Sequence, residues 1–146
     1  MRKDEFVIRG QTEHNATETL NFSGFKPGYA YRMVEFQLYP NTPSGVEAVL
    51  GSVTAGKTAV DPDNVDFNND GLIACALVAY SSSAFDGGIN ESVVNDTFLI
   101  TQNLILKVAN TANSNPINWQ CKFMPVKMGK AEEAVTNYKQ FMISDS

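Results

Sequence analysis

The residues from Thr97 to Ala109 alternate between apolar and polar side chains with unusual regularity. One polar residue, Gln102, interrupts the apolar set, which otherwise consists of Phe98, Ile100, Leu104, Leu106 and Val108. Because successive side chains of an extended strand point to opposite faces, this pattern predicts one long strand with a buried face. A strand of that length needs neighbours on both edges and a second layer over its apolar face, so we expect a sandwich.

Shorter segments of a similar kind are expected to supply the other strands. They are residues 5–10, 16–22, 29–39, 46–53, 72–80 and 119–123. Turn-forming residues separate them, as at Lys26-Pro27-Gly28, where proline presets φ and glycine accepts a positive φ. The unbroken apolar run over 72–80 is typical of a central strand that is covered on both faces.

The alternation also predicts which side chains share a face. In the segment 29–39, one side should carry Val34, Phe36 and Leu38. In the segment 46–53, Glu47 should lie on the face opposite to Val46, Ala48 and Leu50.

The number and spacing of these segments indicate the fold class. About seven or eight short strands are typical of a sandwich or a jelly roll. No helical pattern lies between any two strands, which disfavours a parallel α/β architecture. We therefore expect residues 1–146 to form one all-β domain, an antiparallel, jelly-roll-like β-sandwich with a C-terminal amphipathic helix.

The helix is predicted at about 131–142, where the apolar period changes. Its apolar positions are Ala131, Ala134, Val135, Tyr138, Phe141 and Met142. Glu132 and Glu133 in the first turn and Lys139 near the end suit the helix dipole. We expect this helix to pack on its own sandwich or on a neighbour, with Tyr138, Phe141 and Met142 as interface residues.

Composition excludes some partners. The formal charge of -5 disfavours a nucleic-acid surface, which needs a concentrated positive field. The first residues lack the apolar run of a signal peptide, and no run is long enough for a membrane span. We expect a protein made in the cytoplasm with no membrane partner. Cys75 and Cys121 both fall in apolar runs, which favours buried free thiols over a cross-strand disulfide.

A phosphate-loop pattern occurs at Gly51-Ser-Val-Thr-Ala-Gly56-Lys57-Thr58. In a true phosphate loop, backbone amides hold the phosphates, and a helix follows directly with its amino end toward them. Here Pro62 follows soon after Thr58 and pushes Asp61 out of helical geometry. We interpret the match as accidental and expect no nucleotide cofactor.

Half of a calcium-loop pattern occurs at Asp66-Phe-Asn68-Asn-Asp70-Gly71. The position of the closing glutamate is held by Leu77, so the bidentate ligand is lost. Asp61 and Asp63 are close enough in sequence to contribute oxygens. Two readings stay open, a solvated acidic loop and a weak structural cation site, and we favour the loop without a metal.

The sequence offers little for catalysis. His14 is the only histidine, and it lies among Glu13, Asn15 and Thr17 in an expected loop. One histidine and two distant cysteines are too few for a zinc site, and one histidine does not define a triad. We therefore expect an ordinary surface histidine, no catalytic residue and no enzyme. A sugar-binding face is the alternative that the aromatics allow, built from Phe22, Phe25, Tyr29, Tyr31 and Tyr39.

Several segments carry a family resemblance. They are Ile8-Arg-Gly-Gln-Thr, Glu18-Thr-Leu-Asn-Phe-Ser-Gly with Lys26-Pro-Gly-Tyr-Ala-Tyr, Val94-Asn-Asp-Thr-Phe-Leu-Ile-Thr-Gln-Asn-Leu, Asn118-Trp-Gln-Cys and Glu133-Ala-Val-Thr-Asn-Tyr-Lys. Through them the chain resembles a family of small virion structural proteins from uncultured marine bacteriophages. The resemblance implies a capsid or capsid-associated subunit located in the virion, whose partners are copies of itself and other virion proteins. The alternative is a receptor- or glycan-binding module on the virion surface.

Overall fold

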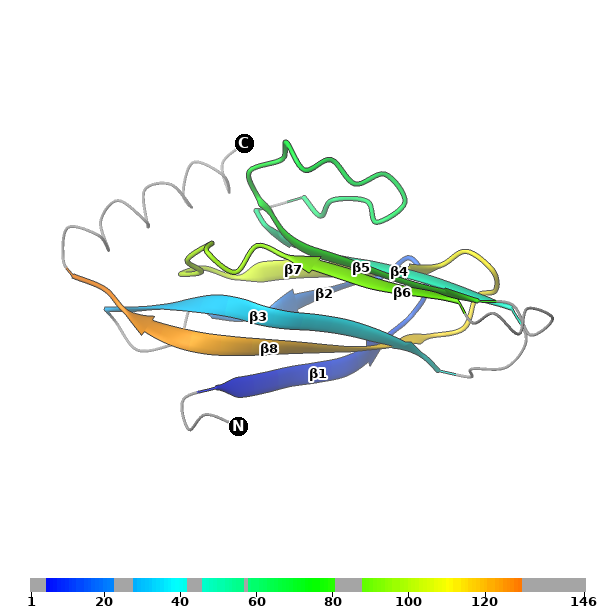
Figure 1. The fold of residues 1–146 in the computed structure, drawn as a ribbon, viewed down its shortest axis with the longest axis horizontal. Helices are drawn as coiled ribbons and strands as arrows, with labels where there is room; N and C mark the ends of the chain where they lie inside the picture. Colours follow the sequence, from blue (N-terminus) through cyan, green and yellow to red (C-terminus); the bar gives the residue numbers. More distant parts are fainter. Residues whose placement is uncertain (1–4, 23–27, 42–45, 57, 81–87, 130–146) are drawn as a thin grey trace.

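The computed structural model describes residues 5–22, 28–41, 46–56, 58–80 and 88–129. In this part of the chain, two antiparallel sheets lie face to face (Figure 1). Their eight strands are β1 (Phe6–Thr12), β2 (Thr17–Leu20), β3 (Tyr29–Pro40), β4 (Glu47–Ala55), β5 (Leu72–Tyr80), β6 (Ile89–Val94), β7 (Leu104–Asn110) and β8 (Ile117–Lys127). The prediction of an all-β antiparallel sandwich is confirmed. The helix expected at 131–142 lies outside the described residues.

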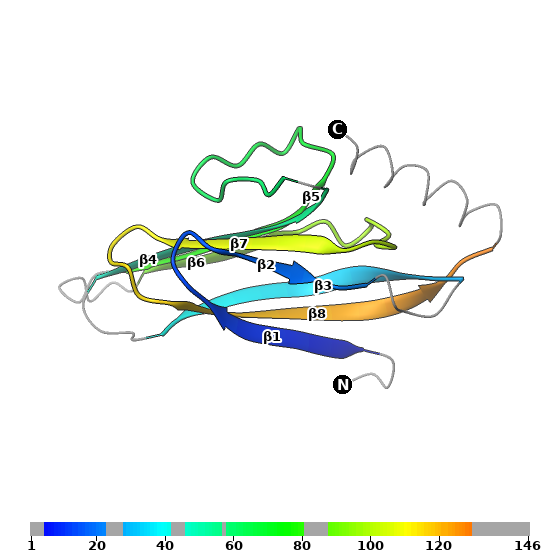
Figure 2. The ribbon, with the colours of Figure 1, turned by 180° about the vertical axis from the view of Figure 1, so that it is seen from behind.

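The strand order follows the nesting of a jelly roll. One sheet has the order β1-β8-β3 and the other β2-β7-β4-β5-β6. The chain therefore folds back on itself in antiparallel pairs, β1 with β8, β2 with β7, and β4 with β5. The fourth nested pair of a jelly roll would join β3 to β6, but β6 pairs with β5 instead. Figure 2 shows β1 and β2 separating into the two layers.

Connections gather at the two ends of the sandwich. Thr12 lies opposite Ile117, and Ile117 lies opposite Pro40, so β1 ends where β8 begins and β3 ends. In the other sheet, Val49 near the start of β4 lies opposite Asn110 at the end of β7. The connections β1–β2, β3–β4, β5–β6 and β7–β8 consequently share one end. The connections β2–β3, β4–β5 and β6–β7 share the other end.

Both sheets contribute to one apolar core. Its largest fully buried side chains include Met33, Phe36, Ile73, Ile100, Leu104, Leu106, Ile117 and Phe123. Burying each such side chain is worth about 1.5–3 kcal/mol, so the seam between the sheets is the main source of stability. Phe22 closes one end of the core, with its ring 4.9 Å from that of Phe123 and 5.3 Å from that of Tyr31.

The single long strand predicted over 97–109 is wrong, although its buried face is right. Only Leu104–Asn110 is a strand, while Ile100 exchanges two backbone hydrogen bonds with Tyr31 in the opposite sheet. The Asn95 side chain accepts hydrogen bonds from the Thr97 amide and hydroxyl, which makes a turn at the start of the segment, and Asn103 Oδ1 accepts a 2.8 Å hydrogen bond from the Phe22 amide just before β7. The segment thus crosses from one layer to the other, and Ile100 and Leu104 are both fully buried.

Two predicted faces are also wrong in part. A register shift between Met33 and Glu35 makes Met33 buried and Val34 exposed, because the extra residue of a bulge reverses the alternation. In β4, Glu47 and Val49 are buried, whereas Val46 is exposed. Glu47 points inward because its carboxylate accepts hydrogen bonds from the side chains of Asn110 and Asn113.

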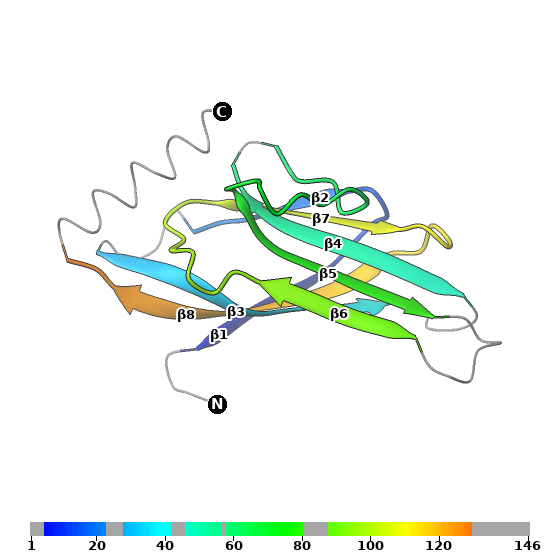
Figure 3. The same ribbon diagram turned by 45° about the horizontal axis from the view of Figure 1, so that its top comes forward.

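The strand β6 was absent from the expected strands. Its sequence, Ile-Asn-Glu-Ser-Val-Val, lacks a regular alternation because most of its side chains are exposed at the edge of the sheet. Figure 3 shows β6 beside β5, with no strand on its other side within the described residues. No helix in those residues has the length and apolarity needed to cross a bilayer.

Gly10 is required by a close approach between β1 and β8. A Cβ atom added at Gly10 would lie 2.9 Å from Cζ2 of Trp119, and the indole is held in place because its Nε1 donates a 2.9 Å hydrogen bond to Thr12 Oγ1. We predict that Gly10→Ala lowers the free energy of unfolding by about 1–3 kcal/mol, through overpacking. Urea denaturation followed by tryptophan fluorescence measures this change.

The matched control is Gly129→Ala, because a Cβ atom there meets nothing within 4 Å. Its unfolding free energy should stay within about 0.5 kcal/mol of wild type. Equal effects of the two substitutions would contradict the role assigned to the Gly10 contact.

Candidate functional site

The outer face of the β1-β8-β3 sheet carries a band of polar side chains, which we call the amide face. It consists of Arg9, Gln11, Gln37, Tyr39, Asn118 and Gln120. The register sets these residues in two rows across the three strands. Gln120 lies between Arg9 and Gln37, and Asn118 lies between Gln11 and Tyr39. The arrangement follows from strand alternation, since the neighbours Trp119 and Leu38 point into the core.

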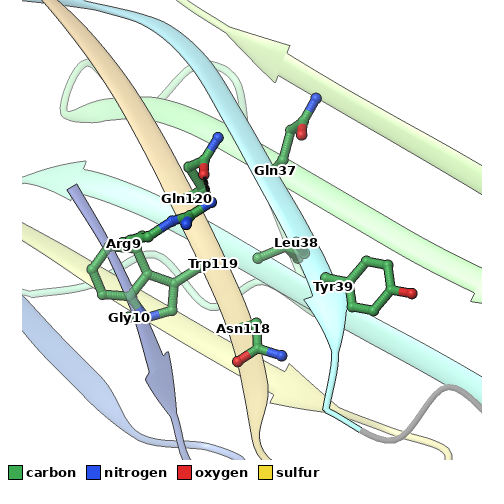
Figure 4. Close-up of a pocket in the computed structure, with 8 residues that line it drawn as sticks. All are labelled: Arg9, Gly10, Gln37, Leu38, Tyr39, Asn118, Trp119 and Gln120. Atoms are coloured by element: carbon green, nitrogen blue, oxygen red, sulfur yellow. Dashed lines mark hydrogen bonds between the residues drawn. The ribbon is translucent and has the colours of Figure 1, made fainter. Parts of the chain in front are cut away.

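Part of the amide face is fixed by its own hydrogen bonds. Arg9 Nη2 donates to Gln120 Oε1, and Gln11 Nε2 donates to Asn118 Oδ1 at 3.0 Å and to Asn41 Oδ1 at 3.1 Å. Figure 4 shows Arg9 beside Gln120 across β8, with Gln37 and Tyr39 along β3. A shallow groove with a volume of about 580 Å³ lies over this region.

The chemistry of the amide face suits a ligand rich in hydroxyl groups. Each amide offers both donors and an acceptor, and the guanidinium of Arg9 retains donors that match a carboxylate. The Tyr39 side chain is 62 % exposed and provides an apolar ring with a polar end. Gln37 and Tyr39 make no side-chain hydrogen bond within the described part of the chain, so their polar groups are available to a ligand.

The aromatic residues named from the sequence do not gather on one face. Phe22 and Tyr31 are buried in the core, and burial raises the pKa of the Tyr31 hydroxyl, with a smaller contribution from Tyr29. Tyr29 is half-buried at the start of β3, and Phe25 lies outside the described residues. Of the four that the structure describes, Tyr39 alone is strongly exposed. The sugar-binding face predicted from the aromatics is therefore wrong in its composition.

A second open surface lies on the outer side of the five-stranded sheet, and we call it the apolar groove. Its lining includes Leu50, Pro62, Val65, Phe67, Cys75, Leu77, Ile89 and Val93, and its volume is about 710 Å³. The loop between β4 and β5 forms one wall and β6 forms the other. Figure 1 shows this loop above the upper layer.

The loop is held against the sheet by two hydrogen bonds. Ser52 Oγ donates to the carbonyl of Val60 at 2.5 Å, and the Val60 amide donates to Thr54 Oγ1 at 3.1 Å. Both hydroxyls belong to the outer face of β4 and are buried. These bonds place Val60 above β4 and so set where the loop lies on this face.

The apolar groove exposes several large apolar side chains together. Phe67 is 68 % exposed, Ile89 55 % and Val93 49 %. Isolated exposed apolar residues are ordinary, but a group of them around one concavity marks an interaction surface. Burial in this groove raises the pKa of the Cys75 thiol. Cys121 is buried in the core, where desolvation raises its pKa strongly, and both thiols are free as predicted.

The nucleotide and calcium patterns occupy ordinary structural positions. Gly51–Ala55 belong to β4, which pairs with β5 and β7, so this part of the motif lies in a ladder and not in a phosphate cradle. In the acidic loop, Asp61 Oδ1 accepts from the Asp63 amide, and Asp66 Oδ1 accepts from the Asn68 amide. These are turns closed by their own side chains. No group of three or more metal-ligating His, Cys, Asp or Glu residues occurs within the described ranges.

His14 takes part in a polar cluster at the end of the sandwich where β4 begins. Its Nδ1 accepts a 2.8 Å hydrogen bond from the Asn110 amide. Glu47 is 1 % exposed, and its Oε2 accepts 3.1 Å hydrogen bonds from the side chains of Asn110 and Asn113. The half-buried His14 is therefore a structural acceptor at the β1–β2 turn. The cluster explains why Glu47 points inward.

Sequence reasoning found neither surface as such. The polar residues of the amide face alternate along their strands, but only the register brings Arg9, Gln120 and Gln37 into one row. The apolar groove depends on where the β4–β5 loop lies, for which the sequence gives no periodic signal. The predicted interface residues Tyr138, Phe141 and Met142 lie outside the described residues.

Comparison with known proteins supports the fold. No protein-family model matches the sequence, and no curated protein matches it. Merkel cell polyomavirus VP1, solved in complex with 3'-sialyllactosamine, is similar with a TM-score of 0.52 and 5% identity, over 86% of this chain and 95% of that one. A structure of TmCBM61 in complex with beta-1,4-galactotriose has a TM-score of 0.34 and 10% identity, over 86% and 83% of the two chains. The chain thus has an all-β sandwich fold similar to that of a viral protein.

The hydrogen bonds of Glu47 give a test of the structure at the end of the sandwich where β4 begins. We predict that Glu47→Ala lowers the free energy of unfolding by about 1–3 kcal/mol, because the Asn110 and Asn113 amides lose a buried acceptor. Glu47→Gln keeps an acceptor in place and should cost less. Urea denaturation of both variants measures the difference, and an unchanged Glu47→Ala protein would refute the structural role of the carboxyl group.

Proposed function

We propose that this protein is a non-enzymatic structural subunit of a bacteriophage particle, which acts by associating with copies of itself and with other virion proteins. The observation that carries the proposal is the apolar groove, with Phe67, Ile89 and Val93 exposed around it. A surface of this kind is costly to leave in water and favours a protein that works with a partner.

The neighbouring edge of the sheet supports the same function. The outer edge of β6 has no paired strand within the described residues. The apolar groove lies beside this unpaired edge, and the two together give an area for association. The likeness in fold to a protein of Merkel cell polyomavirus is compatible with this role, as is the resemblance to phage virion proteins.

Self-association can be tested at the groove. We expect the wild-type protein to form oligomers whose population rises with concentration in sedimentation velocity or mass photometry. Val93→Lys should weaken this association by about 2 kcal/mol, or about thirtyfold, since it places a charge in the apolar contact.

The matched control is Val7→Lys. Val7 is also an exposed strand valine, 40 % exposed, but it lies on β1 in the other sheet. This variant should associate like wild type. A protein that stays monomeric at all concentrations and does not bind purified particles would contradict the proposed function.

A second candidate function is glycan binding by the amide face. It is favoured by the row of amide side chains with the exposed ring of Tyr39 and the guanidinium of Arg9, a set that can bond sugar hydroxyls and stack on a sugar ring. The VP1 structure that this chain resembles in fold is a complex with 3'-sialyllactosamine. In this role the protein would be a receptor- or glycan-binding module on the virion surface.

A glycan array followed by titration calorimetry with a soluble oligosaccharide tests this candidate. Tyr39→Ala should reduce the affinity about tenfold, since it removes the ring platform. Phe67→Ala removes an equally exposed ring from the other surface and should bind like wild type. Failure of every glycan on the array, or equal binding by Tyr39→Ala, would exclude the amide face as a glycan site.

A further inference from the structure

The apolar groove has the chemistry of a site for a segment with one apolar face, such as an amphipathic helix. Its floor is formed by residues of β4 and β5, including Leu50 and Leu77, and its walls are the β4–β5 loop and β6. Phe67 projects from the loop wall, and Val93 projects from the β6 wall. An occupant must bring apolar side chains along one side and keep the other side in water.

The chain itself contains such an occupant. The described residues end at Gly129, and residues 130–146 follow. The sequence of 131–142 has the period of an amphipathic helix, and a helix over that range would be about 18 Å long. Its apolar stripe would consist of Ala131, Ala134, Val135, Tyr138, Phe141 and Met142.

A charged residue beside the stripe adds to the apolar match. On a helical wheel over 131–142, Lys139 flanks the apolar stripe. Asp66 on the loop and Glu91 on β6 are exposed acidic residues that line the groove. A helix lying in the groove can therefore bring Lys139 near an acidic side chain, which adds orientation to the apolar contact.

We propose that residues 131–142 of one copy occupy the apolar groove of a neighbouring copy. The proposal rests on the proposed function, because it names the contact through which the copies associate. It also assigns the predicted interface residues Tyr138, Phe141 and Met142 to a partner surface, the lining around Phe67 and Val93.

The position of β8 favours a neighbouring copy over the same chain as donor. Lys127 pairs with Tyr29 in the β1-β8-β3 sheet, and the Met128 amide donates a 2.9 Å hydrogen bond to the Gly28 carbonyl. The groove is on the outer side of the other sheet, and facing sheets lie about 10 Å apart. The link of Gly129 and Lys130 spans at most about 7 Å. A helix in its own chain would use part of its length to cross the layers, which leaves less of it to lie along the groove than a helix from a neighbouring copy would have.

Cys75 gives a natural probe because its thiol lines the groove. The experiment uses the full chain with Phe141→Cys, prepared as an equal mixture of unlabelled and ¹⁵N-labelled protein and oxidised with copper phenanthroline. We expect disulfide-linked dimers, with Cys75 of one chain joined to position 141 of another. Mass spectrometry of the linked peptides should find unlabelled–labelled pairs in the proportion of random pairing.

Two control variants test whether the cross-link is specific to Cys75 and to the apolar side of the helix. Gln140→Cys places the thiol on the polar side of the predicted helix, and its dimer should be lost or strongly reduced. Adding Cys75→Ser to Phe141→Cys should abolish the dimer, since the acceptor thiol is gone. Sedimentation velocity under reducing conditions shows whether each variant still associates.

The outcomes separate the two proposals. Cross-links found only within one chain would overturn docking on a neighbouring copy. Oligomers that form without any link between positions 75 and 141 would overturn the assignment of the helix to the groove, while the proposed assembly role stands. A protein that is monomeric throughout would overturn both.

Discussion

The structure depends on the pairing of β8 with β1 on one side and β3 on the other. This pairing joins residues that are far apart in the sequence, such as Phe6 with Phe123 and Tyr39 with Asn118. The last strand is therefore the centre of a sheet whose other members come from the first part of the chain. Such non-local contacts carry a large loop-closure entropy and are typical of slowly folding β proteins. Until β8 is in place, Phe36 and Met33 have no complete layer to pack against.

The same constraint gives the two outer faces their different chemistry. The β1-β8-β3 sheet buries one side of every strand against the core and leaves a row of amides, Arg9 and Tyr39 in water. The other sheet carries the β4–β5 loop on its outer side, so apolar residues such as Leu50 and Leu77 remain there half-buried. One face is therefore suited to polar recognition and the other to association through apolar contact.

The fold class could be predicted from the sequence, but only part of each surface could. Alternation and turn chemistry predicted an all-β sandwich, and the buried side chains of Ile100 and Leu104 followed from their spacing. Periodicity could not show that Asn95 turns the chain and sends Ile100 to the opposite sheet, because a turn and a continuous strand bury the same positions. Alternation predicts Glu47 on the face opposite to Val46, Ala48 and Leu50, and it cannot show the partners that hold Glu47 inside, because Asn110 and Asn113 lie far away in the sequence. The amide face depends on strand register and the apolar groove on the position of the β4–β5 loop, and the periodicity of the sequence predicts neither.

The grouping of four connections at one end of the sandwich has a consequence for how the protein can change. The connections β1–β2, β3–β4, β5–β6 and β7–β8 all leave the sheets there, next to Gln11, Tyr39 and Asn118 of the amide face and next to Ile89 of the apolar groove. Loop tips tolerate added sequence far better than paired strands do. Changes of sequence in these connections therefore fall beside both outer surfaces, so the chemistry around each surface can be altered without disturbing the paired strands.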